Sequence, residues 1–91
     1  MGRRSRLELY FHVLDVINRG TYKPTQIMYK TNLSWASLHE IFETLKRSDF
    51  LKSEKEKGRK RYYITEKGKN ALDYYLKSIN DLAETETFSS I

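Results

Sequence analysis

The chain has 91 residues, of which 17 are lysine or arginine and 12 are aspartate or glutamate, giving a formal net charge of +5. It contains no cysteine, which excludes disulfides, thiolate metal sites and thiol nucleophiles. The length suits one compact domain. Because neither a signal peptide nor an apolar run long enough to cross a bilayer is visible, the sequence predicts a cytoplasmic protein.

The positive charge is concentrated in the middle of the chain. Residues 46–69 carry ten basic and four acidic side chains, for a net charge of +6. Residues 1–45 carry six and four (+2), and residues 70–91 carry one and four (−3). A concentrated basic segment favours a polyanionic partner such as nucleic acid.

The first predicted helix begins at a capping box. Ser5 and Glu8 have the spacing at which each side chain satisfies a free backbone N–H of the first turn. The helix is predicted to end near Arg19, because Gly20 can adopt the left-handed conformation that stops a helix. Its apolar residues recur at helical spacing: Leu7, Tyr10, Phe11, Leu14 and Ile17.

Two short helices follow and form a predicted helix-turn-helix. Pro24 suits the first position of a helix that runs to about Lys30. Ser34 is a good N-cap for a further helix over residues 35–47. Apolar residues lie on one face of that helix: Leu38, Ile41, Phe42 and Leu45. A separation of about three residues between two such helices is typical of the helix-turn-helix.

A hairpin and a long helix complete the pattern. Residues 50–55 and 61–64 are β-prone and flank a charged tip over residues 56–60. Thr65 is predicted to cap a helix from Glu66 to about Glu84. Gly68 within it indicates close packing against the hairpin or the first helix. An apolar stripe runs along this last helix: Leu72, Tyr75, Leu76, Ile79 and Leu82.

This order of elements predicts a mainly α fold with a β-hairpin, the winged helix-turn-helix with a long C-terminal helix. The segment over residues 62–68 resembles the strand-to-helix junction of many prokaryotic winged-helix regulators. The segment over residues 23–34 is similar to the helix-turn-helix of small archaeal winged-helix DNA-binding proteins, including the ten-kilodalton chromatin-type coiled-coil family. The resemblance covers residues 5–83 and implies binding of double-stranded DNA without a cofactor, and homodimerisation through an antiparallel coiled coil.

Four segments are expected on this basis. Residues 1–6 form a basic N-terminal arm, residues 7–68 the winged-helix DNA-binding domain, residues 69–84 a C-terminal dimerisation helix, and residues 85–91 a polar tail. The expected function is DNA binding as a transcriptional regulator or a chromatin-type, nucleoid-associated protein. The alternative is a protein-interaction module in a transcription complex, which the exposed Glu40 and Glu43 would suit.

The helix over residues 35–47 is the predicted recognition helix, whose first turns enter the major groove. Its candidate DNA contacts lie near its N-terminus: Ser34, Trp35, Ser37 and Glu40. In the alternative interpretation, Ser34 only caps the helix and Trp35 only covers the edge of the core. Because this face is poor in arginine and lysine, low sequence specificity is expected.

Three further groups of residues are candidates for contact with phosphates. The hairpin tip contributes Lys57, Arg59, Lys60 and Arg61, with Lys55 beside them. The N-terminal arm contributes Arg3, Arg4 and Arg6, which could equally form a solubilising tail. The second helix contributes Lys23, Thr25 and Lys30.

The stripe on the last helix advances mostly in steps of three and four residues, which is typical of a seam that packs on another helix. A homodimer is therefore predicted through this stripe, although part of it could pack on the first helix instead. His12 and His39 have no acidic residues at metal-ligand spacing. Since no catalytic constellation is recognisable either, the sequence predicts no metal, no small-molecule substrate, no membrane association and no enzymatic activity.

Overall fold

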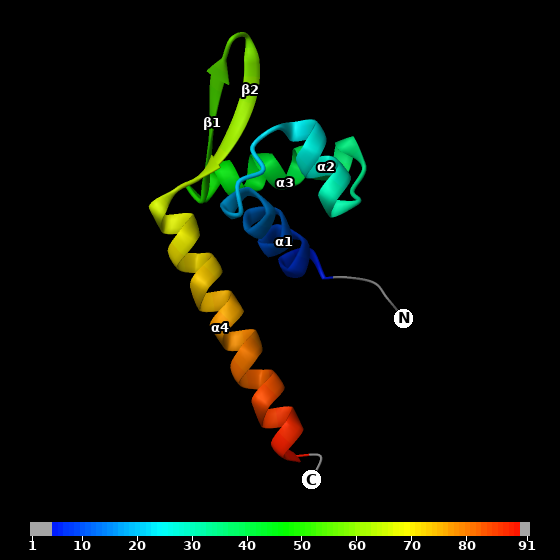
Figure 1. The fold of residues 1–91 in the computed structure, drawn as a ribbon, viewed down its shortest axis with the longest axis vertical. Coiled ribbons are helices and arrows are strands. Elements are labelled where there is room, and N and C mark those ends of the chain that lie inside the picture. The colour runs from blue at the N-terminus through cyan, green and yellow to red at the C-terminus, as the bar shows by residue number, and fades with distance from the viewer. Residues whose placement is uncertain (1–4, 90–91) are drawn as a thin grey trace.

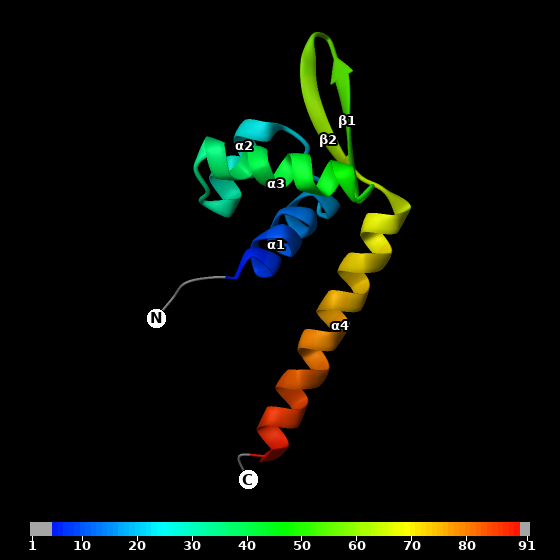
Figure 2. The ribbon, with the colours of Figure 1, turned by 180° about the vertical axis from the view of Figure 1, so that it is seen from behind.

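Four helices and a two-stranded antiparallel hairpin follow one another in the predicted order over residues 5–89, which a computed structural model describes, with side chains for residues 5–83. The elements are α1 (Arg6–Asn18), α2 (Pro24–Thr31), α3 (Trp35–Arg47), β1 (Leu51–Glu56), β2 (Arg59–Ile64) and α4 (Glu66–Ser89). The first three helices pack together, the hairpin rises on one side of them, and α4 runs away on the other (Figure 1). Seen from behind, α3 lies in front, below the hairpin and above α1 (Figure 2).

The predicted helix caps are confirmed. The Ser5 hydroxyl accepts a hydrogen bond from the Glu8 backbone N–H at 3.1 Å, and the Glu8 carboxylate accepts one from the Ser5 N–H at 3.2 Å. Ser34 accepts from the Ser37 N–H at 3.2 Å at the start of α3. Thr65 accepts from the Gly68 N–H at 3.0 Å at the start of α4. These side chains fix where three of the helices begin.

The core joins the three-helix domain to the base of the hairpin. Its fully buried residues come from five elements: Val13, Leu14, Ile17, Ile27, Leu38, Phe42, Tyr62 and Leu72. The rings of Phe42 in α3 and Tyr62 in β2 are stacked, with centroids 3.9 Å apart and planes 15° apart. Such a pair stabilises the fold by about 0.5–1.5 kcal/mol beyond the area that it buries. It also ties the hairpin to α3.

The hairpin turn is tighter than predicted. The expected five-residue tip over residues 56–60 is wrong, because the strands pair as far as Glu56 opposite Arg59 and only Lys57 and Gly58 form the turn. Both turn residues have positive φ, 52° and 76°, as in the two-residue turns that match the twist of paired strands. Glu56 faces Arg59 and Glu54 faces Arg61 across the strands, which favours this register, whereas Lys55 faces Lys60 and brings two positive charges together beside the turn.

Close packing at Gly68 is confirmed. A Cβ atom at this position would lie 2.8 Å from Ile64 Cγ1 and would press on the carbonyl oxygen of Phe50. The start of α4 therefore rests directly on the base of the hairpin. About two turns further on, the ring of Tyr75 stacks on Phe11 of α1, with centroids 4.2 Å apart.

The structure corrects two predictions about α4. The helix continues to Ser89 rather than ending near Glu84, because residues 84–91 contain no glycine or proline that would stop it. Leu72, predicted as a dimer contact, is only 1% exposed within its own chain and belongs to the core. The first part of α4 lies beside α1, where Leu72 is buried and Tyr75 stacks on Phe11, and the second part extends past the domain (Figure 1).

Candidate nucleic-acid interface

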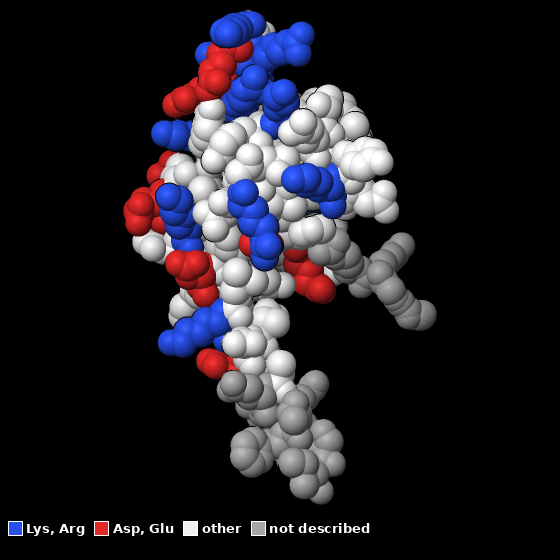
Figure 3. All heavy atoms as spheres, viewed as in Figure 1, with Lys and Arg blue, Asp and Glu red and all other residues white. Residues whose placement is uncertain are grey.

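The hairpin, residues 51–64, carries the densest group of available positive charge in the described part of the chain. Four exposed basic side chains lie at its tip and form no ion pair with another described residue: Lys55, Lys57, Arg59 and Lys60. Figure 3 shows basic side chains gathered over this end of the molecule. Their mutual repulsion is relieved when an anion such as a phosphate binds among them.

Arg61, also predicted as a wing contact, differs from these four. Its Nε lies 3.4 Å from a carboxylate oxygen of Glu56, and the Tyr63 hydroxyl donates a hydrogen bond to the other oxygen. The hydrogen bond from Tyr63, and then the one from Arg61, lowers the pKa of Glu56. Glu56 is therefore ionised at neutral pH and offsets the charge of Arg61, which leaves Arg61 less available to a phosphate than its neighbours.

The polar side chains at the start of α3 are engaged within the protein. Ser34 caps the helix, and its hydroxyl also donates to the Ser37 hydroxyl at 3.1 Å. Trp35 fits both interpretations made from the sequence, because its ring packs edge-on against Phe42, at 6.5 Å between centroids, and is still 50% exposed. All four predicted contacts on α3 are exposed, and among the described residues Trp35 is the one of them without a hydrogen bond to another side chain.

Glu40 is held by Arg6, and this corrects the prediction for the N-terminal arm. Arg6 lies in the first turn of α1, because the helix begins at the Ser5 cap, and its Nη2 donates to Glu40 at 3.0 Å. A residue paired across 34 positions of sequence is part of the domain rather than of an arm. Arg3 and Arg4, the other predicted arm residues, lie outside the described residues.

The predicted contacts on α2 also differ in whether their side chains already bond within the protein. Lys23 occupies the N-cap position without a side-chain cap, and Thr25 is exposed in the first turn. The backbone amides at this helix start are therefore not capped by the side chain of Lys23 and suit a phosphate oxygen. Lys30, by contrast, donates to the Thr21 hydroxyl at 2.8 Å.

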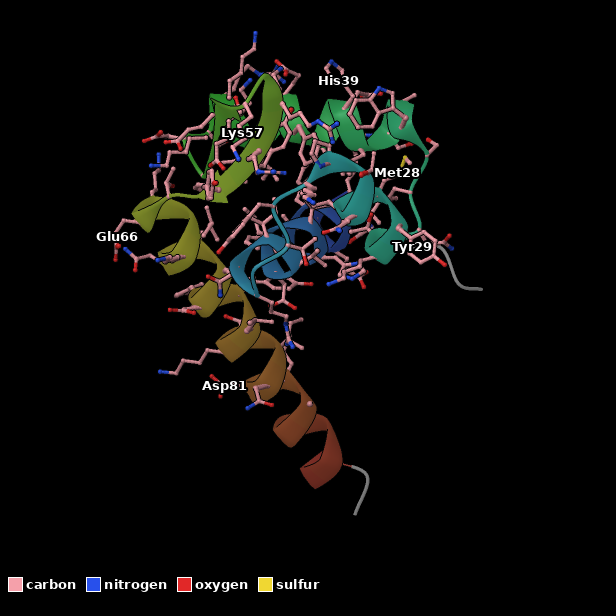
Figure 4. All side chains as sticks on the ribbon, turned by 45° about the horizontal axis from the view of Figure 1, so that its top comes forward. Met28, Tyr29, His39, Lys57, Glu66 and Asp81 are labelled. Carbon is pink, nitrogen blue, oxygen red and sulfur yellow. The ribbon has the colours of Figure 1, made fainter. Side chains whose placement is uncertain are left out.

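Two exposed residues were missed by the sequence prediction. His39 lies one turn after Trp35 on α3, at 6.1 Å between ring centroids, and Tyr29 on α2 is 89% exposed. Figure 4 shows both on the helical domain, with His39 toward the same side as Lys57 of the hairpin. The spacing of His39 from Trp35 could have indicated a shared helix face, whereas nothing in the sequence distinguished Tyr29 from a core aromatic.

The open part of the α4 stripe is a second exposed feature. Beyond Tyr75, which Phe11 covers, the side chains of Leu76, Ile79 and Leu82 are 46%, 48% and 63% exposed. Figure 2 shows this half of α4 extending past α1. Large aliphatic side chains at helical spacing and half open to solvent are typical of a surface that another helix covers.

Neither a metal cluster nor a membrane-spanning helix occurs among the described residues. No three histidine, cysteine, aspartate or glutamate side chains within this part of the chain lie together so that they could hold a metal ion. Nor does any helix in it have both the length and the apolar character needed to cross a membrane.

A helix, a helix-turn-helix, a two-stranded wing and a long final helix define the winged-helix class of proteins, and the predicted fold class is confirmed. Residues 3–84 match the winged helix-turn-helix family, and the chain belongs to this family. Comparison with curated protein sequences gave no match.

Solved structures share the fold at low sequence identity. Sso10a-2, a DNA-binding protein from Sulfolobus solfataricus, is 23% identical with a TM-score of 0.72, covering 96% of this chain and 94% of its own. Bordetella bronchiseptica BpsR, whose DNA binding is regulated by 6-hydroxynicotinic acid, is 14% identical with a TM-score of 0.76, covering 85% of this chain. Lactococcus lactis ZitR, solved in complex with DNA, is 15% identical with a TM-score of 0.72, covering 94% of this chain.

The present chain spans 58% of the length of BpsR and 61% of that of ZitR, so it corresponds to part of each. Its similarity to Sso10a-2 extends over nearly the whole of both chains. The predicted likeness to small archaeal winged-helix DNA-binding proteins is thereby confirmed.

Proposed function

We propose that this winged helix-turn-helix protein binds double-stranded DNA, with α3 in the major groove and the hairpin along the phosphates. The observation that carries the proposal is the group of four exposed, unpaired cations at the hairpin tip. Membership of the winged helix-turn-helix family supports it, as does a neighbour of the same fold solved in complex with DNA. The protein acts in the cytoplasm, on the nucleoid, as a transcriptional regulator or chromatin-type protein with no catalytic step.

Binding is dominated by phosphate contacts and depends weakly on sequence. The unpaired cations lie on the hairpin, whereas α3 has no arginine or lysine before Lys46. Cations that meet phosphates release counterions, so the logarithm of the affinity falls linearly with the logarithm of the salt concentration.

The test is a fluorescence anisotropy titration of a labelled duplex over a series of salt concentrations. Replacing Lys57, Arg59 and Lys60 together by alanine removes up to three phosphate contacts and should flatten the salt slope by up to about 2.7, at roughly 0.9 per contact. The matched control replaces three exposed lysines of α4, which removes the same charge away from the hairpin tip: Lys67, Lys69 and Lys77.

The control should keep a steeper slope than the hairpin variant. Equal slopes for the two variants would remove the hairpin from the interface. Weak binding that does not respond to salt would overturn DNA binding as the function and favour a protein-interaction module.

The DNA-binding unit is a homodimer joined through the second half of α4. Leu76, Ile79 and Leu82 remain half open to solvent after α1 has covered Leu72 and Tyr75. The same three side chains on a second copy can bury this surface, because a two-fold axis brings identical patches together. Two recognition helices on one dimer also suit two successive turns of the major groove.

A further inference from the structure

The start of α3 presents an unusual surface for a helix that faces DNA. Its polar side chains already have partners in the protein, since Ser34 is bonded to Ser37 and Glu40 to Arg6. Its basic residues, Lys46 and Arg47, lie in its last turn. No arginine or lysine is therefore available in the first two turns for the bidentate contact that reads guanine.

What remains free in these turns is mostly apolar. The exposed residues without a hydrogen bond to another described residue are Trp35, Ala36 and His39. Trp35 and Ala36 together offer an indole face and a methyl group at the end of the helix that enters the groove first.

Trp35 is connected to the hairpin through rings of the buried core. Trp35 packs edge-on against Phe42, with ring planes 75° apart, and Phe42 stacks on Tyr62 of β2. His39 flanks the indole at 6.1 Å. Because these rings join α3 to the hairpin, phosphate binding by the hairpin positions the start of α3, with the half-exposed indole of Trp35, toward the major groove.

We infer that Trp35 and Ala36 read the C5-methyl group of thymine. That methyl is the one apolar group that the four bases present in the major groove, and apolar side chains recognise it by contact. The inference rests on the proposed binding of duplex DNA and names what the recognition helix reads there. It predicts a modest preference for thymine on top of phosphate binding.

The experiment compares two duplexes that differ in methyl groups alone. In one the sequence is mixed and contains thymine, and in the other every thymine is replaced by uracil, which pairs in the same way and carries the same charge. Removal of each contacted methyl should weaken binding about fourfold, which corresponds to roughly 0.8 kcal/mol for one buried methyl-sized group. The salt slope should be the same for both duplexes, because no phosphate contact changes.

A second pair of duplexes separates the methyl group from the shape of A·T-rich DNA. Cytosine and 5-methylcytosine differ by a methyl at the same edge of the major groove, so methylation should tighten binding. A preference for thymine over uracil without a preference for 5-methylcytosine would indicate that duplex shape is read, and would overturn the inference.

Substitutions at two exposed aromatic positions provide the matched variants. Trp35→Ala should lose the discrimination between thymine and uracil and keep the salt slope, and Trp35→Phe should retain part of the discrimination. Tyr74→Ala removes an exposed ring from α4 and should leave the discrimination intact. Because Trp35 is the only tryptophan, its emission should also change on binding.

The outcomes distinguish this inference from the function on which it rests. Failure to bind either duplex would overturn DNA binding itself. Salt-dependent binding of equal strength to thymine and uracil duplexes, with unchanged tryptophan emission, would leave DNA binding in place and overturn the reading of thymine by Trp35. The duplex comparison uses the unaltered protein, so the result does not depend on how well the variants fold.

Discussion

Replacing Ile79 by aspartate should dissociate the proposed dimer. Ile79 is 48% exposed in the single chain, so a partner helix can bury about half of a side chain whose complete burial is worth roughly 1.5–3 kcal/mol. That is about 1 kcal/mol per copy and about 2 kcal/mol for the two copies. Since 1.4 kcal/mol is a factor of ten, the dimer should weaken by about 30-fold, and further because a carboxylate enters an apolar seam.

Sedimentation equilibrium over a series of protein concentrations measures this change. The matched control is Tyr74→Asp, which adds the same charge and removes an exposed apolar side chain on another face of α4. Leu82→Asp should act like Ile79→Asp. A wild-type monomer at micromolar concentration, or dissociation by the control but not by Ile79→Asp, would show that this stripe is not the interface.

Three further predictions concern stability and the hairpin. Gly68→Ala should lower the free energy of unfolding by roughly 1–3 kcal/mol, because the added Cβ meets the hairpin base. Urea denaturation measures this change. A variant as stable as the control Asn70→Ala, at an exposed position of the same helix, would contradict the prediction. The lowered pKa of Glu56 predicts that its contribution to stability is present above the unfolded pKa and is lost as the pH falls through the folded pKa. The difference in Tm between the wild type and Glu56→Gln should accordingly disappear in acid. Glu56→Gln should also free Arg61 and steepen the salt slope by up to about 0.9, and an unchanged slope would show that Arg61 meets no phosphate.

Local sequence signals predicted most of the fold. The caps at Ser5, Ser34 and Thr65 placed three helix starts, and the bounds of the helix over residues 35–47 are those of α3. These signals work because a cap bonds within its own helical turn, so its effect depends on residues three positions apart.

Features that depend on distant residues escaped prediction. Arg6 and Glu40 lie 34 positions apart in the sequence, and their pairing joins α1 to α3. It changes what each side chain can do at the site. The stripe on α4 looks uniform along the sequence, and only the placement of α1 shows that Leu72 is covered while Ile79 is not. The availability of Arg61 likewise depends on Glu56 and Tyr63, which surround it only when the strands pair.

The stacked rings of Phe11 and Tyr75 have a consequence for the geometry of the proposed dimer. They form the joint at which α4, about 36 Å long for 24 residues at 1.5 Å each, leaves the three-helix domain. In a two-fold assembly the angle at this joint sets the separation of the two α3 helices, which must match about 34 Å between successive major grooves. The direction of α4 therefore determines the distance between the two α3 helices, and that direction depends on one aromatic pair. A change in that pair alters how well both halves fit the duplex, although neither ring belongs to α3 or to the hairpin.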